Sequence, residues 1–279
     1  MGGAEHATRH LIYARFWHKF LYDIGMVKND EPFTRLQNVG LILAEDGRKM
    51  SKRWGNVINP DDIVEEFGAD AMRLYEMFMG PFDQTCAWST NGLIGTRRFL
   101  ERVWTLAEKI KNQKSKIKIT NQNAKINTVL HQTIKKVSDD IEAMRYNTAI
   151  AHMMTLVNEM IKAADAGSLL VTPYSLFIQL LAPFAPHVAE EIWEALGNKN
   201  SIFKSTWPVY DPALAIVSEV TIAIQVNGKL RDAIVMDAEV SEDEAKKFAL
   251  ASEKVQKWLE GKTPKKVIYI KGKLISIVV

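Results

Sequence analysis

The sequence predicts a mainly α-helical protein with α/β segments at both ends. Between residues 59 and 196, long stretches repeat apolar residues at intervals of three and four, which is typical of amphipathic helices. After Ser218 the apolar period changes to two, which favours strands. The 279 residues are 47% hydrophobic and 25% charged, so the chain is long and apolar enough for several domains with buried cores.

Composition excludes several classes of protein. Charged residues or histidine break the apolar stretches every few positions, so no membrane span is expected, and the first residues do not resemble a signal peptide. We therefore expect a cytoplasmic protein. The single cysteine, Cys86, excludes an internal disulfide and a cysteine-rich zinc site. A net charge of +3 permits binding to nucleic acid without requiring it.

The N-terminal segment is expected to hold one helix and one strand. Apolar spacing predicts an amphipathic helix over residues 4–24, ended by Gly25. The turn Gly2-Gly3 precedes it, and the free N–H groups of a helix N-terminus favour an anionic or hydroxyl-rich ligand. A short buried strand is expected within residues 34–43, followed by a turn at 45–47.

Helices are expected to dominate the middle of the chain. Residues 49–56 are polar and basic and are predicted as a loop. Asn59 and Pro60 begin a helix over residues 60–67, and Asp70 is expected to cap the helix that follows. Further helices are expected over 89–111, 124–140, 146–165 and 173–196, the last three as a bundle.

Residues 218–279 are expected to form a small β-β-α-β-β domain. Asn227-Gly228 is a strong signal for a hairpin, and Ser241-x-x-Glu244 is a capping box that begins a helix running to about Leu259. Lys271-Gly272 marks a second hairpin. The register of the first hairpin stays open, because a regular two-residue turn would leave it without a clean apolar face.

The most informative motif is the basic loop at residues 49–53. Transfer of an adenylyl group builds negative charge on the departing pyrophosphate, and ammonium groups on a mobile loop can meet that charge as it develops. Lys49 and Lys52 suit this role, with Met50 and Ser51 between them. The alternative interpretation is a solvated basic loop without chemistry.

Two blocks of sequence around this loop resemble one family. The string KMSKR at 49–53 resembles the KMSKS signature of class I aminoacyl-tRNA synthetases, and GNVINPDDIVEEFGADAMRLYEMFMGP after it resembles bacterial leucyl-tRNA synthetase. The opening, GGAEHATRHLIYARFWHKFLYDIG, resembles the GG-x-EHA block in the second half of that family's Rossmann fold. Arg53 stands where the family has Ser, and Trp54 where it commonly has a small or basic residue, which bears on loop mobility.

The resemblance implies a role for each residue near the loop. Lys49, Ser51 and Lys52 are expected to act in catalysis, with Lys52 and secondarily Lys49 stabilising the pyrophosphate of ATP, which is bound with Mg²⁺ as substrate. His10 is expected to line the leucine side-chain pocket, and Glu5 to accept both ribose hydroxyls. No zinc is expected. The residues implied in ATP and adenylate binding are Gly2, Gly3, Glu5, His6, Met50 and Lys52.

The same residues also allow plainer interpretations. Glu5 fits a carboxylate that complements a helix dipole, and His6 and His10 fit surface or core histidines. A zinc site at the two histidines is disfavoured because no third ligand is evident.

Two further blocks, Arg145–Ile150 and residues 181–197, resemble the anticodon-binding helical domain shared by the leucyl, isoleucyl and valyl enzymes. Basic residues gather before this domain and at the C-terminus, where they are expected to contact tRNA(Leu) phosphates or else to form solvated faces. They are Arg97, Arg98, Arg102, Lys109, Lys111, Lys114, Lys116 and Lys118 in the first cluster, and Lys262, Lys265, Lys266, Lys271 and Lys273 in the second.

The resemblance covers residues 2–279 and implies four segments. Residues 1–58 would be the C-terminal part of a Rossmann catalytic domain with the KMSKS-like loop, and 59–90 a stem-contact helical segment. Residues 91–217 would be an anticodon-binding-type bundle, and 218–279 a C-terminal tRNA-binding domain.

The HIGH signature of the family's N-terminal strands and its editing domain do not occur in this sequence. We therefore expect the chain to be inactive alone and to contribute its ATP loop and tRNA-binding domains to leucylation with an N-terminal partner. A natural second subunit, a truncated gene product and a non-catalytic tRNA-binding module remain alternatives, as does isoleucyl or valyl specificity.

Overall fold

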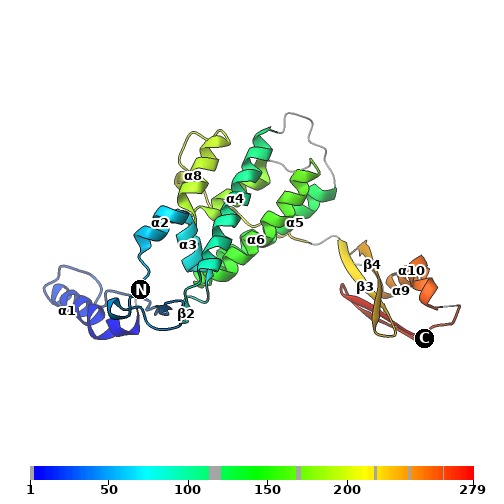
Figure 1. Ribbon diagram of the computed structural model, residues 1–279, viewed down its shortest axis with the longest axis horizontal. Coiled ribbons are helices and arrows are strands. Elements are labelled where there is room, and N and C mark those ends of the chain that lie inside the picture. The colour runs from blue at the N-terminus through cyan, green and yellow to red at the C-terminus, as the bar shows by residue number, and fades with distance from the viewer. Residues whose placement is uncertain (1–2, 113–120, 168–170, 217–218, 238–239, 260) are drawn as a thin grey trace. The chain divides into compact units, whose positions relative to one another are not determined.

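The computed structural model describes residues 3–112, 121–167, 171–216, 219–237, 240–259 and 261–279. They form two compact units, residues 1–211 and 212–279 (Figure 1). Helices dominate the first unit and a four-stranded sheet the second, which confirms the predicted fold class. No helix among these described residues is long and apolar enough to cross a membrane.

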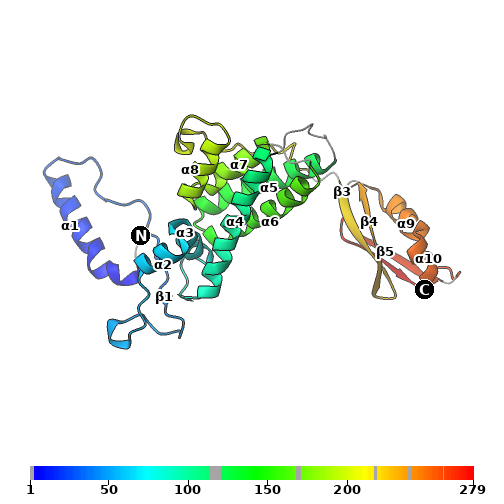
Figure 2. The same ribbon diagram turned by 45° about the horizontal axis from the view of Figure 1, so that its top comes forward.

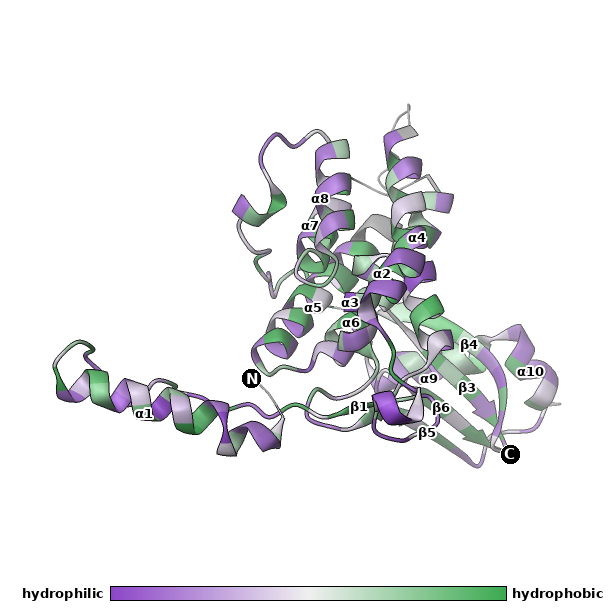
Figure 3. Ribbon diagram, turned by 60° about the vertical axis from the view of Figure 1, so that its left-hand side comes forward, coloured by the Kyte–Doolittle hydropathy of each residue, from purple (hydrophilic) through white to green (hydrophobic). Residues whose placement is uncertain are grey.

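The expected helix over residues 4–24 is interrupted. A 3-10 helix η1 (Ala4–Thr8) and the α-helix α1 (His10–Asp23) meet at Arg9, whose φ of −124° and ψ of −91° are not helical. The end is as expected: Gly25, at φ +74°, has the left-handed conformation of a residue that closes a helix. No residue of α1 is buried, and apolar segments recur along the helix (Figure 3).

The expected strand within 34–43 is reduced to β1 (Ile42–Leu43), which pairs in parallel with β2 (Cys86–Ala87). The two segments approach closely just before they pair. A Cβ atom on Gly40 would lie 1.8 Å from the carbonyl oxygen of Gln84, so this position accepts only glycine. Within the part of the chain that the structure describes, no third strand joins this pair.

Among the described residues, seven more α-helices belong to the first unit, and most of their apolar residues belong to one core. The expected helix over 173–196 is two helices, because Pro186 lacks an N–H group and disfavours a helical conformation at Ala185. The seven helices are α2 (Pro60–Phe67), α3 (Ala69–Phe78), α4 (Thr90–Asn112), α5 (Asn121–Glu142), α6 (Tyr146–Asp165), α7 (Val171–Leu181) and α8 (Pro186–Ala195).

Caps at α2 and α3 test two sequence expectations. Asn59 caps α2, as expected, by accepting the Asp61 N–H at 3.3 Å. The expectation that Asp70 caps its own helix is wrong, since Gly68 is the N-cap of α3 and makes no side-chain bond. Asp70 is buried and its carboxylate instead accepts the N–H of Val188, in the first turn of α8, at 2.7 Å.

The second unit is a sheet covered on one face by two helices (Figure 2). The strand order is β4-β3-β6-β5, and the central strands β3 and β6 run parallel. Its strands are β3 (Glu219–Val226), β4 (Lys229–Asp237), β5 (Lys266–Ile270) and β6 (Leu274–Val278), and its helices α9 (Glu242–Ala251) and α10 (Glu253–Leu259).

Local signals in this unit are confirmed, with one exception. Asn227 and Gly228 form the predicted turn, both at positive φ, and Ser241 and Glu244 form the predicted capping box. The single helix expected to reach Leu259 is instead broken at Ser252, whose backbone is extended and whose hydroxyl donates to Asp232 at 2.5 Å.

A β-bulge settles the register that the sequence left open. Gln225 pairs with Leu230, but Ile224 pairs with Asp232, so Arg231 is an extra residue in β4. The shift leaves Ile224 fully buried in the core of this unit.

Candidate functional site

The lysine loop, residues 49–53, follows a short hairpin that begins in β1. The Ala44 N–H donates to the Arg48 carbonyl at 2.9 Å, and Leu43 and Lys49 form an antiparallel bridge. Ser51 then caps a 3-10 helix, η2 (Lys52–Trp54), with its Oγ accepting the Arg53 N–H at 3.2 Å. The expected loop over 49–56 is therefore confirmed, but it contains one tight helical turn.

Both lysines of this loop face solvent. Lys49 and Lys52 are exposed, whereas Met50 between them is half-buried and packs against the helical core. Among the described residues, neither ammonium group forms a salt bridge, while the neighbouring Arg48 is paired with Asp46 at 2.6 Å. The two lysines are therefore available to meet an anion.

The two departures from the family motif contact each other. The guanidinium carbon of Arg53 lies 5.5 Å from the ring centroid of Trp54, and that of Arg48 lies 5.1 Å from it. Trp54 is 57% exposed, so each contact contributes only about 0.5–1 kcal/mol.

The turn of the hairpin is attached to the first residue of α4. Oε1 of Glu45 accepts the Thr90 N–H at 2.9 Å and the Thr90 hydroxyl at 2.7 Å. These bonds hold the pKa of Glu45 below its ordinary value. The sequence predicts only a turn at Glu45, because no local pattern identifies a partner that is 45 residues away.

Near the N-terminus, four predicted site residues lie in two pairs. The Glu5 carboxylate lies beside Gly3, where an added Cβ would be 2.3 Å from Oε2. The rings of His6 and His10 lie 6.5 Å apart at their centroids. The single helix that the sequence predicts through both histidines is interrupted between them, at Arg9. Gly2 lies outside the described residues.

A pocket of about 320 Å³ opens beside His10. His10 packs against Phe33, with ring centroids 6.3 Å apart. The remaining residues of its lining are Leu11, Arg15, Glu31, Thr34, Arg35 and Leu36.

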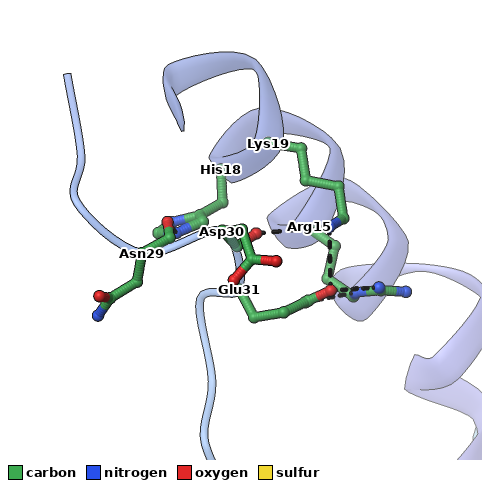
Figure 4. Close-up of polar contacts among 6 residues, drawn as sticks. All are labelled: Arg15, His18, Lys19, Asn29, Asp30 and Glu31. Carbon is green, nitrogen blue, oxygen red and sulfur yellow. Dashed lines mark hydrogen bonds and ion pairs between the residues drawn. The ribbon is translucent and has the colours of Figure 1, made fainter. Parts of the chain in front are cut away.

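One wall of this pocket is fixed by charged contacts to α1 (Figure 4). Glu31 accepts from Arg15 Nε at 2.9 Å and Nη2 at 2.6 Å, and it pairs with Lys19 at 3.0 Å. The hydrogen bonds from Arg15 and Lys19 lower the pKa of Glu31 to about 2. His18 Nε2 also donates to the Asn29 carbonyl at 2.8 Å, so the chain after α1 is held along the helix.

The N-terminal residues and the lysine loop remain separate in this structure. Within the described parts of the chain, no hydrogen bond, salt bridge or ring contact joins residues 3–10 to residues 49–53. Nor does any group of three or more His, Cys, Asp or Glu side chains among the described residues form an arrangement that could hold a metal ion.

The arginines of the first basic cluster differ in what they contact. Arg97 donates to Glu101 at 3.0 Å and to the Phe67 carbonyl at 2.8 Å, and Arg102 donates to Asn158. Arg98 is exposed, and the described residues give its guanidinium no bond. In the same cluster, Lys109 pairs with Asp165 at 2.7 Å, while Lys114, Lys116 and Lys118 lie outside the described residues.

The C-terminal lysines do not form one compact group. Lys265 and Lys266 lie at the beginning of β5, whereas Lys271 and Lys273 follow its other end. A strand rises about 3.3 Å per residue, so the two pairs are roughly 20 Å apart along the chain.

Comparison with known proteins gives two family matches. Residues 11–89 match the tRNA synthetases class I (I, L, M and V), and residues 123–246 match the anticodon-binding domain of tRNA ligase. Together these matches lie in both of the compact units and include the lysine loop.

Solved structures extend the similarity to nearly the whole chain. The Agrobacterium radiobacter K84 agnB2 LeuRS, in a ternary complex with tRNA and LeuAMS, is 33% identical with a TM-score of 0.73. The match covers 99% of this chain but 36% of that chain. Mycobacterium tuberculosis methionyl-tRNA synthetase bound by methionyl-adenylate shares the fold, at 20% identity and a TM-score of 0.55, over 71% of this chain and 44% of that chain.

Proposed function

The chain belongs to the class I tRNA synthetases of the I, L, M and V group, and we propose that it acts in the ATP-dependent leucylation of tRNA(Leu). The observation that carries leucine specificity is the 33% identity to a LeuRS over 99% of the chain. To this reaction the chain contributes the pyrophosphate loop and the tRNA-binding domains.

In the first step, a carboxylate oxygen of leucine bonds to the α-phosphorus of ATP. The bond from that phosphorus to the bridging oxygen breaks, and pyrophosphate leaves with the electron pair. Lys52, and secondarily Lys49, stabilise the charge that develops on pyrophosphate, since both are exposed and unpaired among the described residues. Ser51 supports Lys52 by capping η2. Mg²⁺ enters with ATP as part of the substrate.

The N-terminal residues would hold the other parts of the adenylate. Glu5 accepts the ribose hydroxyls, and Gly3, which has no Cβ, leaves room for the Glu5 carboxylate beside it. His6 supports the adenylate, with Met50 contributing from the loop. The apolar part of the lining of the 320 Å³ pocket beside His10, which is Leu11, Phe33 and Leu36, suits the isobutyl side chain of leucine.

The exposed apolar residues of α1 and the shortness of β1 and β2 support the proposal that a further part of the catalytic domain completes the site. Parallel strands are normally covered on both faces and continued by other strands, whereas β1 and β2 pair over two residues each. We propose that the remaining strands and the HIGH segment, in the same or another polypeptide, cover α1, and that these 279 residues alone do not activate leucine. The large apolar residues exposed on α1 are Ile12, Tyr13, Phe16, Trp17, Phe20 and Tyr22.

The test is leucine-dependent ATP–pyrophosphate exchange after the chain is mixed with a class I N-terminal half carrying HIGH. Lys52→Ala is expected to lower the exchange rate by about 10²-fold or more, the usual effect of losing one group that stabilises developing charge. Lys28→Ala, at an exposed lysine outside the loop, is the matched control. An unchanged rate in Lys52→Ala would remove the assigned role, and exchange with isoleucine or valine in place of leucine would reassign the specificity.

A second candidate is a tRNA-binding module without catalysis, favoured by the anticodon-binding match over residues 123–246. It predicts salt-sensitive tRNA binding by the chain and no exchange when the N-terminal half is supplied.

A further inference from the structure

Asn56 contacts the lysine loop at two backbone positions. Its Oδ1 accepts the Ser51 N–H at 2.9 Å, and its Nδ2 donates to the Lys49 carbonyl at 3.5 Å. The first bond holds the residue before Lys52, and the second holds Lys49 itself. Asn56 is half-buried, and its bond to the Ser51 N–H is partly shielded from competing water, whereas its bond to the Lys49 carbonyl is exposed.

Besides Asn56, the hairpin side and η2 contact each other where the Arg48 guanidinium carbon lies 5.1 Å from the ring centroid of Trp54, a contact between two exposed side chains that holds neither lysine backbone. The bridge between Leu43 and Lys49 fixes only the hairpin side, and the Ser51 cap fixes only η2. Between them lies Met50, which anchors the middle of the loop to the helical core. Asn56 also lowers the pKa of the Asp46 carboxyl, to a smaller extent than Arg48 does.

We propose that Asn56 is a positioning residue that sets the separation of the Lys49 and Lys52 ammonium groups. It holds the backbone at both lysines at once, so the two charges reach the departing pyrophosphate in one arrangement rather than many. The inference rests on the proposed role of these lysines, and Asn56 itself touches no reacting atom.

The first experiment measures hydrogen exchange at the Ser51 amide in the full chain. Asn56→Ala removes the acceptor and is expected to accelerate exchange about tenfold, whereas Asn56→Asp keeps an oxygen acceptor and retains the protection. Asn38→Ala is the control, since Asn38 is exposed and the described residues give its side chain no hydrogen bond. An unchanged Ser51 exchange rate in Asn56→Ala would overturn the inference.

The second experiment uses pyrophosphate exchange with the N-terminal half. Asn56→Ala is expected to lower kcat about tenfold and to leave the KM for leucine unchanged, because the leucine pocket is elsewhere. Combined with Lys52→Ala, it is expected to add little further loss, because Asn56 acts through the lysines. If the losses from Asn56→Ala and Lys52→Ala multiply in the double variant, Asn56 does not act through Lys52.

The two experiments separate failure of this inference from failure of the proposed function. If the unsubstituted mixture shows no leucine-dependent exchange, the proposed function is wrong. Hydrogen exchange at Ser51 still decides whether Asn56 holds the loop, because that measurement needs neither substrate nor partner.

Discussion

The carboxylate of Asp70 accepts the backbone N–H of Val188 at 2.7 Å, so the first turn of α3 caps α8 from 118 residues away. The other oxygen of Asp70 accepts from the His187 ring at 2.8 Å and from the His187 N–H at 3.4 Å. The first N–H groups of a helix have no hydrogen-bond partner within that helix, and Asp70 accepts from two of these groups in α8.

Asp70→Ala is expected to destabilise the first unit by about 2 kcal/mol, because it removes a charged cap from a buried position. Urea unfolding monitored by helical circular dichroism measures this loss. His187→Ala is the matched control: its backbone N–H remains, and its ring is 74% exposed, so little change is expected. Equal losses in the two variants would contradict the capping role.

Gly40→Ala is expected to separate β1 from β2, because its Cβ would lie 1.8 Å from the Gln84 carbonyl oxygen. Faster hydrogen exchange at the Cys86 and Trp88 amides, which donate to Leu41 and Leu43, measures the separation. Gly47→Ala is the control, because a Cβ on Gly47 would meet nothing within 4 Å. Its only cost is the backbone strain at φ +74°, roughly 1 kcal/mol, so the Cys86 and Trp88 amides should keep their protection.

The pKa of Glu31 predicts how the contact between α1 and the chain after it responds to pH. The pKa is lowered from 4.5 to about 2, so the carboxylate stabilises the folded form fully above pH 4.5 and loses that effect as the pH falls toward 2. Carbon NMR of the Glu31 carboxyl should give a midpoint near 2. Arg15→Gln should raise the midpoint more than Lys19→Gln, since Arg15 is the largest cause.

Arg98 is expected to contact a tRNA phosphate, because the described residues leave its guanidinium unbonded. Arg98→Ala should weaken tRNA binding and reduce the slope of log affinity against log salt by roughly 1. Titrations at several salt concentrations measure this slope. The sequence also predicts a tRNA contact for Arg97, but its guanidinium is bonded to Glu101 and to the Phe67 carbonyl, so Arg97→Ala should reduce the slope less than Arg98→Ala does. If the unsubstituted chain, Arg98→Ala and Arg97→Ala give identical slopes, Arg98 does not contact a tRNA phosphate.

Predictions from the sequence succeeded where the physical cause lies within about four residues. The Asn59 cap, the Ser241 capping box and the turn at Asn227 each depend on bonds between near neighbours. The partner of Asp70 could not be predicted, because it depends on how α3 packs beside α8. The break at Ser252 has a similar origin, since its hydroxyl bonds to Asp232 on another element.

The candidate site divides in the same way. The lysines of the loop are identified by their motif, and their exposure is as the proposed chemistry requires. Asn56 and Glu45 are not identified by any pattern, because their partners depend on the path of the folded hairpin.

Because of the bulge at Arg231, deletion of this one residue is expected to keep the strand pairing of β4. Because Gln225 pairs with Leu230 and Ile224 with Asp232, deletion of Arg231 would join two segments whose partners are already consecutive. The ladder would become regular, and no apolar side chain would change face. A strand without a spare residue has no such freedom, since losing one residue turns every later side chain to the opposite face.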